Sequence, residues 1–167
     1  MARMNLPMPI LVGGGAAELY TGGEFLSGDL DIVTPHQSVF EREIQKFGFV
    51  RSSGNGKPLR GFFHPTLDIG IEVVGSVLMD GQTSRDHIRI FDFSGQRIRI
   101  IAPEDLIADR MAQAFSGRSP DSLMIEQACL IYTLAEGLDF AYLNKRISAE
   151  TGGSADLQTL LEWAGNV

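Results

Sequence analysis

The sequence predicts an α+β fold, with strands and helices mixed up to about residue 101 and helices alone after it. In the first part, short apolar runs end at glycines or prolines, which is typical of strands joined by tight turns. After Ala102, apolar residues recur at helical spacing between glycine and proline breaks. We therefore expect an α/β core over residues 1–101 and a helical segment packed on it over residues 102–167.

The core is expected to begin with a buried strand, because residues 9–12 form an apolar run that stops at three glycines. A short helix over 16–20 and a strand over 30–33 are expected next, and an amphipathic pattern predicts a surface helix over 37–47. Further strands are predicted at residues 49–51, 59–63, 67–74, 88–93 and 97–101, with turns at 54–58 and 94–96. The helices of the second part are predicted at residues 103–115, 119–136, 140–150 and 155–163.

Charge and composition exclude several classes of protein. The formal net charge is −7, which argues against a general nucleic-acid binder, since such proteins carry a basic face. No apolar run reaches the roughly 20 residues that a membrane-spanning helix needs, and the N-terminal segment is a poor secretory signal. The single cysteine, Cys129, allows neither an internal disulfide nor a cysteine-based metal cluster. We expect a cytoplasmic protein with no membrane partner.

Two aspartates, Asp29 and Asp31, stand at the start of a predicted strand. Side chains alternate along a strand, so both carboxylates are expected on one face, with their backbones about 6.5 to 7 Å apart. Two like charges on one face repel, and a divalent cation such as Mg²⁺ relieves that repulsion. The alternative is a turn cap or an exposed strand edge, because two acids separated by one residue are a common pattern.

The glycines at residues 13–15 lie between a predicted strand and a predicted helix. Glycine lets a phosphate approach the backbone closely, and the start of the helix offers free N–H groups. A tight packing turn with no ligand is the alternative. A dinucleotide-binding turn is a poor match, because Glu18 occupies the place of its third glycine.

A third acid is expected on the predicted strand at residues 67–74, where Asp68, Gly70 and Glu72 would share one face. Acids in such a place either bind the metal or activate an attacking hydroxyl. We favour Glu72 over Asp68, because Glu72 is surrounded by apolar residues that give it no other evident role. A solvent-facing side of the strand is the alternative.

Together these residues resemble the nucleotidyltransferase superfamily, which has the fold of DNA polymerase beta. Val12-Gly13-Gly14 is similar to its first motif, and Asp29-Leu30-Asp31-Ile32 to its second; Ser27 also matches a position where Ser or Thr is common. The pattern looks most like the small prokaryotic group that includes abortive-infection type toxins. The helix that starts at Pro103 and carries Arg110 is similar to one in that group, so the resemblance covers roughly residues 10–135.

This resemblance implies a mixed β-sheet core flanked by helices, followed by the C-terminal helical segment. It also implies transfer of a nucleoside monophosphate from an NTP to a hydroxyl, with Mg²⁺ as cofactor. Metal binding and catalysis would fall to Asp29, Asp31 and Glu72, and nucleotide contacts to Gly13, Gly14, Ser27 and Arg110. The acceptor stays open between a protein, a tRNA and a small molecule, as do the choice of NTP and the oligomeric state.

A catalytically silent member of the same fold, which binds a nucleotide or a partner protein, is the second hypothesis. Members of the resembling group often carry a basic residue shortly before the aspartate pair. Here residues 23–26 are acidic and apolar, with Glu24 among them. Absence of a basic residue weakens phosphate binding, so this segment favours the hypothesis of a catalytically silent protein.

Overall fold

The computed structural model describes residues 1, 4–51, 61–83, 85–117 and 119–165, so the turn predicted at residues 54–58 lies outside the described part. The chain divides into two compact units. The first contains Met1–Ala16 and Leu26–Ile101, and the second contains Ala17–Phe25 and Ala102–Val167.

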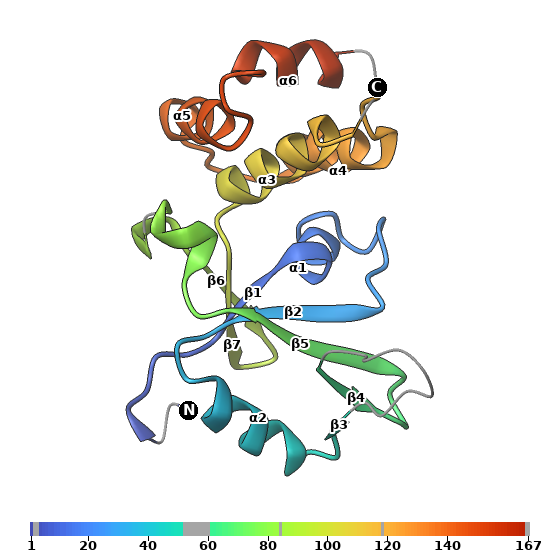
Figure 1. Ribbon diagram of the computed structural model, residues 1–167, viewed down its shortest axis with the longest axis vertical. Coiled ribbons are helices and arrows are strands. Elements are labelled where there is room, and N and C mark those ends of the chain that lie inside the picture. The colour runs from blue at the N-terminus through green and yellow to red at the C-terminus, as the bar shows by residue number, and fades with distance from the viewer. Residues whose placement is uncertain (2–3, 52–60, 84, 118, 166–167) are drawn as a thin grey trace. The chain divides into compact units, whose positions relative to one another are not determined.

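The described residues of the first unit form a seven-stranded mixed sheet in the order β3-β4-β5-β2-β1-β7-β6 (Figure 1). The central strand β1 runs antiparallel to β2 and parallel to β7, and β2 runs parallel to β5. This mixed sheet with its helices confirms the predicted fold class. The strands are β1 (Ile10–Val12), β2 (Asp29–Val33), β3 (Val50–Arg51), β4 (Phe62–His64), β5 (Ile69–Gly75), β6 (Arg89–Phe93) and β7 (Gln96–Ile100).

Strand register gives the central sheet one apolar face and one acidic face. Leu11 of β1 pairs with Ile32 of β2, and Leu30 of β2 pairs with Ile71 of β5. Directly paired residues point to the same side of a sheet, and neighbours along a strand point to opposite sides. The residues between these apolar ones therefore point the other way, and they include Val12, Asp29, Asp31, Gly70 and Glu72.

Helices α1 (Gly13–Tyr20) and α2 (Gln37–Gln45) meet the apolar face. Gly15 of α1 lies so close to Leu11 and Leu30 that a Cβ at Gly15 would come within 2.9 Å of the Leu30 side chain. In α2, Phe40 and Ile44 are buried, and they line the same pocket as residues of β4 and β5. The spacing of these two buried residues is the amphipathic pattern that predicted α2.

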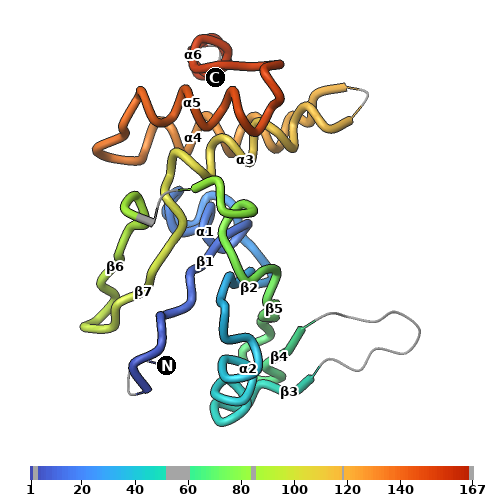
Figure 2. Tube along the Cα trace, turned by 60° about the vertical axis from the view of Figure 1, so that its left-hand side comes forward, coloured from blue at the N-terminus to red at the C-terminus, as the bar shows by residue number. Residues whose placement is uncertain are grey.

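The β6–β7 hairpin closes one edge of the sheet and has the predicted turn (Figure 2). Ser94 and Gly95 both have left-handed backbone angles, with φ of 52° and 78°, which suits a two-residue turn between antiparallel strands. The Gly95 N–H donates a hydrogen bond of 2.9 Å to the Asp92 carboxylate. Two short 3₁₀ segments, Leu78–Gly81 and Arg85–His87, precede the hairpin, and no sequence pattern had predicted them.

In the second unit, four helices follow Ala102 within the described residues. They are α3 (Pro103–Phe115), α4 (Ser122–Leu134), α5 (Phe140–Glu150) and α6 (Leu157–Ala164). Helix α3 packs against α4 and α5, and α6 packs against the same two helices. Asp121, Asp139 and Asp156 cap the starts of α4, α5 and α6 by accepting backbone N–H groups. No helix in the described part of the chain is long and apolar enough to cross a membrane.

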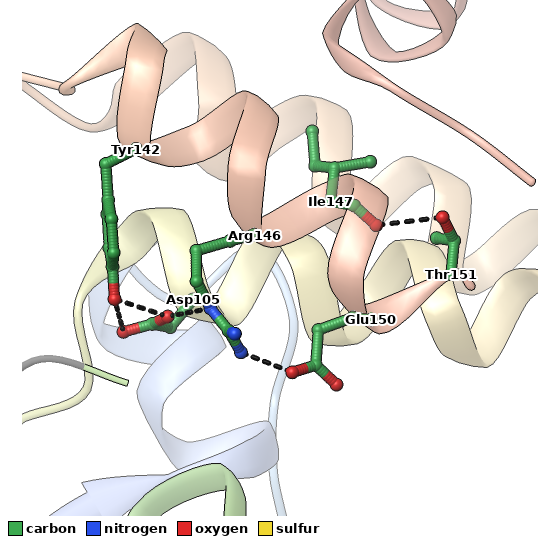
Figure 3. A network of polar contacts seen from close by, with 6 residues as sticks. All are labelled: Asp105, Tyr142, Arg146, Ile147, Glu150 and Thr151. Carbon is green, nitrogen blue, oxygen red and sulfur yellow. Dashed lines mark hydrogen bonds and ion pairs between the residues drawn. The ribbon is translucent and has the colours of Figure 1, made fainter. Parts of the chain in front are cut away.

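A buried ionic network ties α3 to α5 in this unit (Figure 3). The Asp105 carboxylate accepts a 2.6 Å hydrogen bond from Nε of Arg146 and a 2.9 Å hydrogen bond from the Tyr142 hydroxyl. Arg146 also donates to Glu150, one turn along α5. The side chains of Asp105 and Arg146 are only 2% and 3% exposed. Burial raises the pKa of Asp105, against the opposing effect of the hydrogen bonds from Tyr142 and Arg146.

Candidate functional site

Asp29 and Asp31 open β2 on the acidic face of the sheet, as the alternation of side chains predicts. Asp29 is exposed and Asp31 is half-buried, while the next residues of β2, Ile32 and Val33, are buried. The strand therefore passes from solvent into the core within five residues. The two carboxylates stand at the solvent end of this strand, where a ligand can reach them.

Asp31 lies against the start of α1. In the register of the sheet Asp31 pairs with Val12, and Gly13 follows Val12 directly. A Cβ built on Gly13 would overlap the Asp31 carboxylate. Gly13 also has a left-handed φ of 62°, which L-residues other than glycine adopt only with strain. Two independent constraints, the space and the backbone angle, therefore require glycine at residue 13. The helix dipole in turn favours the negative charge of Asp31 beside the start of α1.

The glycine segment is part of α1 and does not precede it as a separate turn. The sequence predicted a helix from residue 16, whereas α1 begins at Gly13. Only Gly13 of the three glycines has a left-handed φ, so Gly14 and Gly15 can continue the helix. The backbone N–H groups of the first helical turn have no helical partner, so they are the groups that an anion would meet.

Ser27 stabilises the start of β2 through a hydrogen bond. Its hydroxyl donates a 2.6 Å hydrogen bond to the backbone carbonyl of Asp29. A Cβ on Gly14 would come within 2.7 Å of the same hydroxyl oxygen, so Ser27 lies beside the first turn of α1. The structure thus brings together Gly13, Gly14, Ser27 and the aspartate pair.

Glu72 pairs directly with Asp31 across the β2–β5 ladder, which assigns its side chain to the acidic face. Glu72 also borders a pocket of about 460 Å³ between α2 and strands β4 and β5. The register of the sheet assigns the Glu72 side chain to the face that carries Asp31.

Asp68 is not on β5, which corrects the expectation that Asp68, Gly70 and Glu72 share a strand face. The strand starts at Ile69, one residue later. Asp68 has a left-handed φ of 54°, and its N–H donates to the carbonyl of His64 in a turn. Aspartate tolerates this conformation better than most residues, and the turn leaves Asp68 exposed and outside the ladder.

The donor set suits a magnesium ion held by two carboxylates. Mg²⁺ prefers hard oxygen ligands and commonly takes one or two protein carboxylates, with phosphate oxygens and water in the other positions. The glycine at residue 13 leaves the Asp31 carboxylate room that a side chain would fill. In the described parts of the chain, no group of three or more His, Cys, Asp or Glu side chains is arranged to hold a metal ion. A third ligand from Glu72 therefore stays a prediction.

Arg110 lies on α3, in the second unit, and its described contacts are all with α3 and α4. It is buried, and Nη1 donates a 3.1 Å hydrogen bond to Gln113 and lies 3.4 Å from the Asp109 carboxylate. Nη1 also lies 3.9 Å from the sulfur of Met124. These contacts all involve Nη1, and the buried Nε of Arg110 has no hydrogen-bond partner among the described residues. The predicted role of Arg110 toward a nucleotide stays a prediction.

This arrangement of strands and helices is similar to that of a solved structure. An antigenic nucleotidyltransferase-like protein from Paracoccidioides brasiliensis superposes with a TM-score of 0.64 over 96% of this chain and 86% of its own, at 15% sequence identity. The fold is nucleotidyltransferase-like. No protein-family model and no curated protein matches the sequence.

Sequence reasoning missed two features of this chain. Gly70 lies directly under the Asp29 carboxylate, and a glycine inside a strand is a signal of close approach that could have identified it. The pair of Asp105 and Arg146 also went unnoticed. Arg146 directly follows Asn144 and Lys145 in α5, so no sequence signal marks it as buried or names its partner.

Substitution of Gly13 is expected to cost more than substitution of a glycine with the same backbone angle elsewhere. Gly22, with φ of 65°, has no atom within 4 Å of an added Cβ, so Gly22→Ala isolates the cost of the left-handed angle, about 1–2 kcal/mol. Gly13→Ala adds a clash with Asp31, for which overpacking costs about a further 1–3 kcal/mol. Urea unfolding of both variants measures the difference between their losses of stability. Equal losses would show that the Asp31 side chain moves away from the added methyl group without a cost in stability.

Proposed function

We propose that this chain is a Mg²⁺-dependent nucleotidyltransferase that moves a nucleoside monophosphate from an NTP to a hydroxyl of an acceptor. The proposal rests on one observation. Asp29 and Asp31 of β2 lie on the same face of the sheet, and Asp31 lies beside Gly13 at the start of α1. Carboxylates for a metal and free N–H groups for a phosphate then lie next to each other. The nucleotidyltransferase-like fold supports this general kind of activity.

In this proposal each residue has a definite task. Asp29 and Asp31 hold the ion, while the backbone at Gly13 and Gly14, with Ser27 beside it, receives the phosphates. Mg²⁺ bound there supplies neutralisation of phosphate charge and a lower pKa for the attacking hydroxyl. The acceptor oxygen bonds to the α-phosphorus, the bond to the β-phosphate oxygen breaks, and pyrophosphate leaves.

Glu72 and Arg110 have supporting tasks. Glu72, in register with Asp31, completes the metal site or accepts the proton of the acceptor hydroxyl. For Arg110, a contact with the triphosphate or the acceptor is what the resemblance implies. The acceptor is a protein, a tRNA or a small molecule, and the resemblance to abortive-infection type toxins is compatible with a cytoplasmic toxin–antitoxin setting.

A catalytically silent nucleotide- or partner-binding module is the second candidate. Two observations favour it. Glu24 is exposed in the segment before β2, where a positive charge would help to hold phosphates. In addition, the formal net charge of the chain is −7, which does not attract a negatively charged NTP. Such a protein would bind Mg²⁺ and an NTP, or a partner, without turnover.

Transfer assays and calorimetry on the full chain separate the two candidates. Each of the four α-labelled NTPs is offered with Mg²⁺ and with a protein, a tRNA and a small polyol as acceptors, and EDTA serves as the control. Label that moves to an acceptor only with Mg²⁺ supports the transferase. Calorimetric binding of a non-hydrolysable NTP with no transfer supports the silent module, and failure to bind any NTP contradicts the transferase.

A further inference from the structure

Gly70 is a glycine whose backbone conformation does not require glycine. It lies within β5, it is buried, and its φ is outside the left-handed region. Glycine in a strand interior weakens the strand, because it has more freedom to lose on folding and no side chain to pack. Another residue with a small side chain would therefore suit the backbone better, so the reason for glycine lies in the space around it.

That space is filled by Asp29. Gly70 pairs directly with Asp29 in the parallel ladder, and its N–H donates a 3.2 Å hydrogen bond to the carbonyl of Gly28. A Cβ built on Gly70 would overlap Oδ1 of Asp29 and come within 2.9 Å of its Cγ. The Asp29 carboxylate thus lies against the backbone of β5, in the place that a side chain at Gly70 would take.

The other glycine of β5 behaves differently. A Cβ on Gly75 would meet its nearest neighbour, the carbonyl oxygen of Val77, at 3.5 Å, which is an ordinary contact. Glu72, two residues after Gly70 on the same face, keeps a full side chain. On the acidic face of β5, glycine therefore stands at the position where a side chain would overlap the Asp29 carboxylate.

We propose that Gly70 is a positioning residue that sets the direction of the Asp29 carboxylate and, through it, the affinity of the site for a divalent cation. The link to cation affinity rests on the proposed function, whereas the positioning of Asp29 does not. In Gly70→Ala the methyl group forces Asp29 to rotate about its Cα–Cβ bond, so the carboxylate leaves the face of β5. Changes to groups that orient metal ligands typically lower metal affinity by about 10–100-fold.

Binding of Mn²⁺ to the full chain, followed by its electron paramagnetic resonance signal, tests this. Gly70→Ala is expected to bind Mn²⁺ at least about tenfold more weakly. Gly28→Ala, which has no atom within 4 Å of the added Cβ and no left-handed φ, should bind as the wild type does. Melting temperature is expected to stay equal or to rise in Gly70→Ala, since alanine removes the flexibility of glycine in the unfolded chain.

A cycle with Asp29 distinguishes positioning from general damage. If Gly70 acts through Asp29, then Gly70→Ala causes no further loss of Mn²⁺ binding in the Asp29→Asn background. An equal loss in both backgrounds, or unchanged binding in Gly70→Ala, overturns the link to the cation.

A crystal structure of Gly70→Ala tests the positioning even if the wild type fails to bind Mn²⁺, a result that would contradict the proposed function alone. A displaced Asp29 carboxylate over an unchanged backbone supports the positioning role. An Asp29 side chain in its original place overturns it.

Discussion

Asp31→Asn is expected to lower the rate of nucleotide transfer by at least about 100-fold while leaving the fold as stable as the wild type. Loss of a metal ligand removes several kcal/mol of charge stabilisation, and each 1.36 kcal/mol is a factor of ten in rate. Stability should change little, because Asn is the same size as Asp, and the relief of repulsion between two carboxylates on one face offsets the loss of a negative charge beside the start of α1. Labelled-nucleotide transfer and thermal unfolding measure the two effects.

Mg²⁺ provides a second readout for the same variant. A ligand that binds only the folded state raises its stability, so Mg²⁺ should raise the melting temperature of the wild type but not of Asp31→Asn. Asp68→Asn is the matched control, since Asp68 is exposed in a turn outside β5. A similar loss of activity in both variants would mean that activity depends on the total negative charge of the protein and not on the position of Asp31.

Glu72→Gln decides the role of the third acid. If Glu72 ligates metal or accepts a proton, this variant should lose activity to an extent similar to Asp31→Asn, because Glu72 is in direct register with Asp31. Activity close to that of the wild type would leave Asp29 and Asp31 as the carboxylates of the proposed site.

Alternation within a single strand could be predicted from the sequence, but the pairing between strands could not. The face shared by Asp29 and Asp31 follows from the period of a strand alone. The positions of Glu72 beside Asp31, and of Gly70 beside Asp29, depend on how β2 and β5 align, and these strands are far apart in sequence. Register of that kind is fixed by the packing of a whole sheet, which no local pattern records.

Local chemistry also explains which element boundaries could be predicted. Helix α3 spans residues 103–115 as expected, because Pro103 and the acids after it mark a helix start strongly. The start of α1 was misplaced, since glycine indicates a turn more often than a helix. The start of β5 was placed too early, because the left-handed angle of Asp68 is set by its hydrogen bond to His64 and leaves no mark in the hydrophobic pattern.

Arg146→Met is expected to destabilise the helical unit by about 3–5 kcal/mol at neutral pH. Removal of one partner from a buried ion pair leaves the other charge buried without compensation. In this variant Asp105 would keep the hydrogen bond from Tyr142 but lose the cation that donates to it at 2.6 Å. Thermal unfolding should show a shift of roughly 6–20 °C, since 1 kcal/mol corresponds to about 2–4 °C in a chain of this length.

The pH dependence of Arg146→Met has a definite sign. Burial already raises the pKa of Asp105 in the wild type, and loss of the Arg146 charge raises the pKa further. A carboxyl whose pKa is higher in the folded state contributes most to stability below its unfolded pKa, near 4, and that contribution is lost as pH rises through the folded pKa. The deficit of Arg146→Met should therefore shrink as pH falls toward 4.

A double variant shows whether the network acts as a unit. Asp105→Leu combined with Arg146→Met replaces the ion pair by apolar groups, and such replacements are often neutral or stabilising. The double variant should therefore be more stable than Arg146→Met alone. Arg42→Met is the control, because Arg42 is 65% exposed and solvent screens its ion pair with Glu43, so its loss should leave stability almost unchanged. Additive losses in the double variant would show that Asp105 and Arg146 stabilise α3 and α5 separately, through packing, and not through their mutual charge.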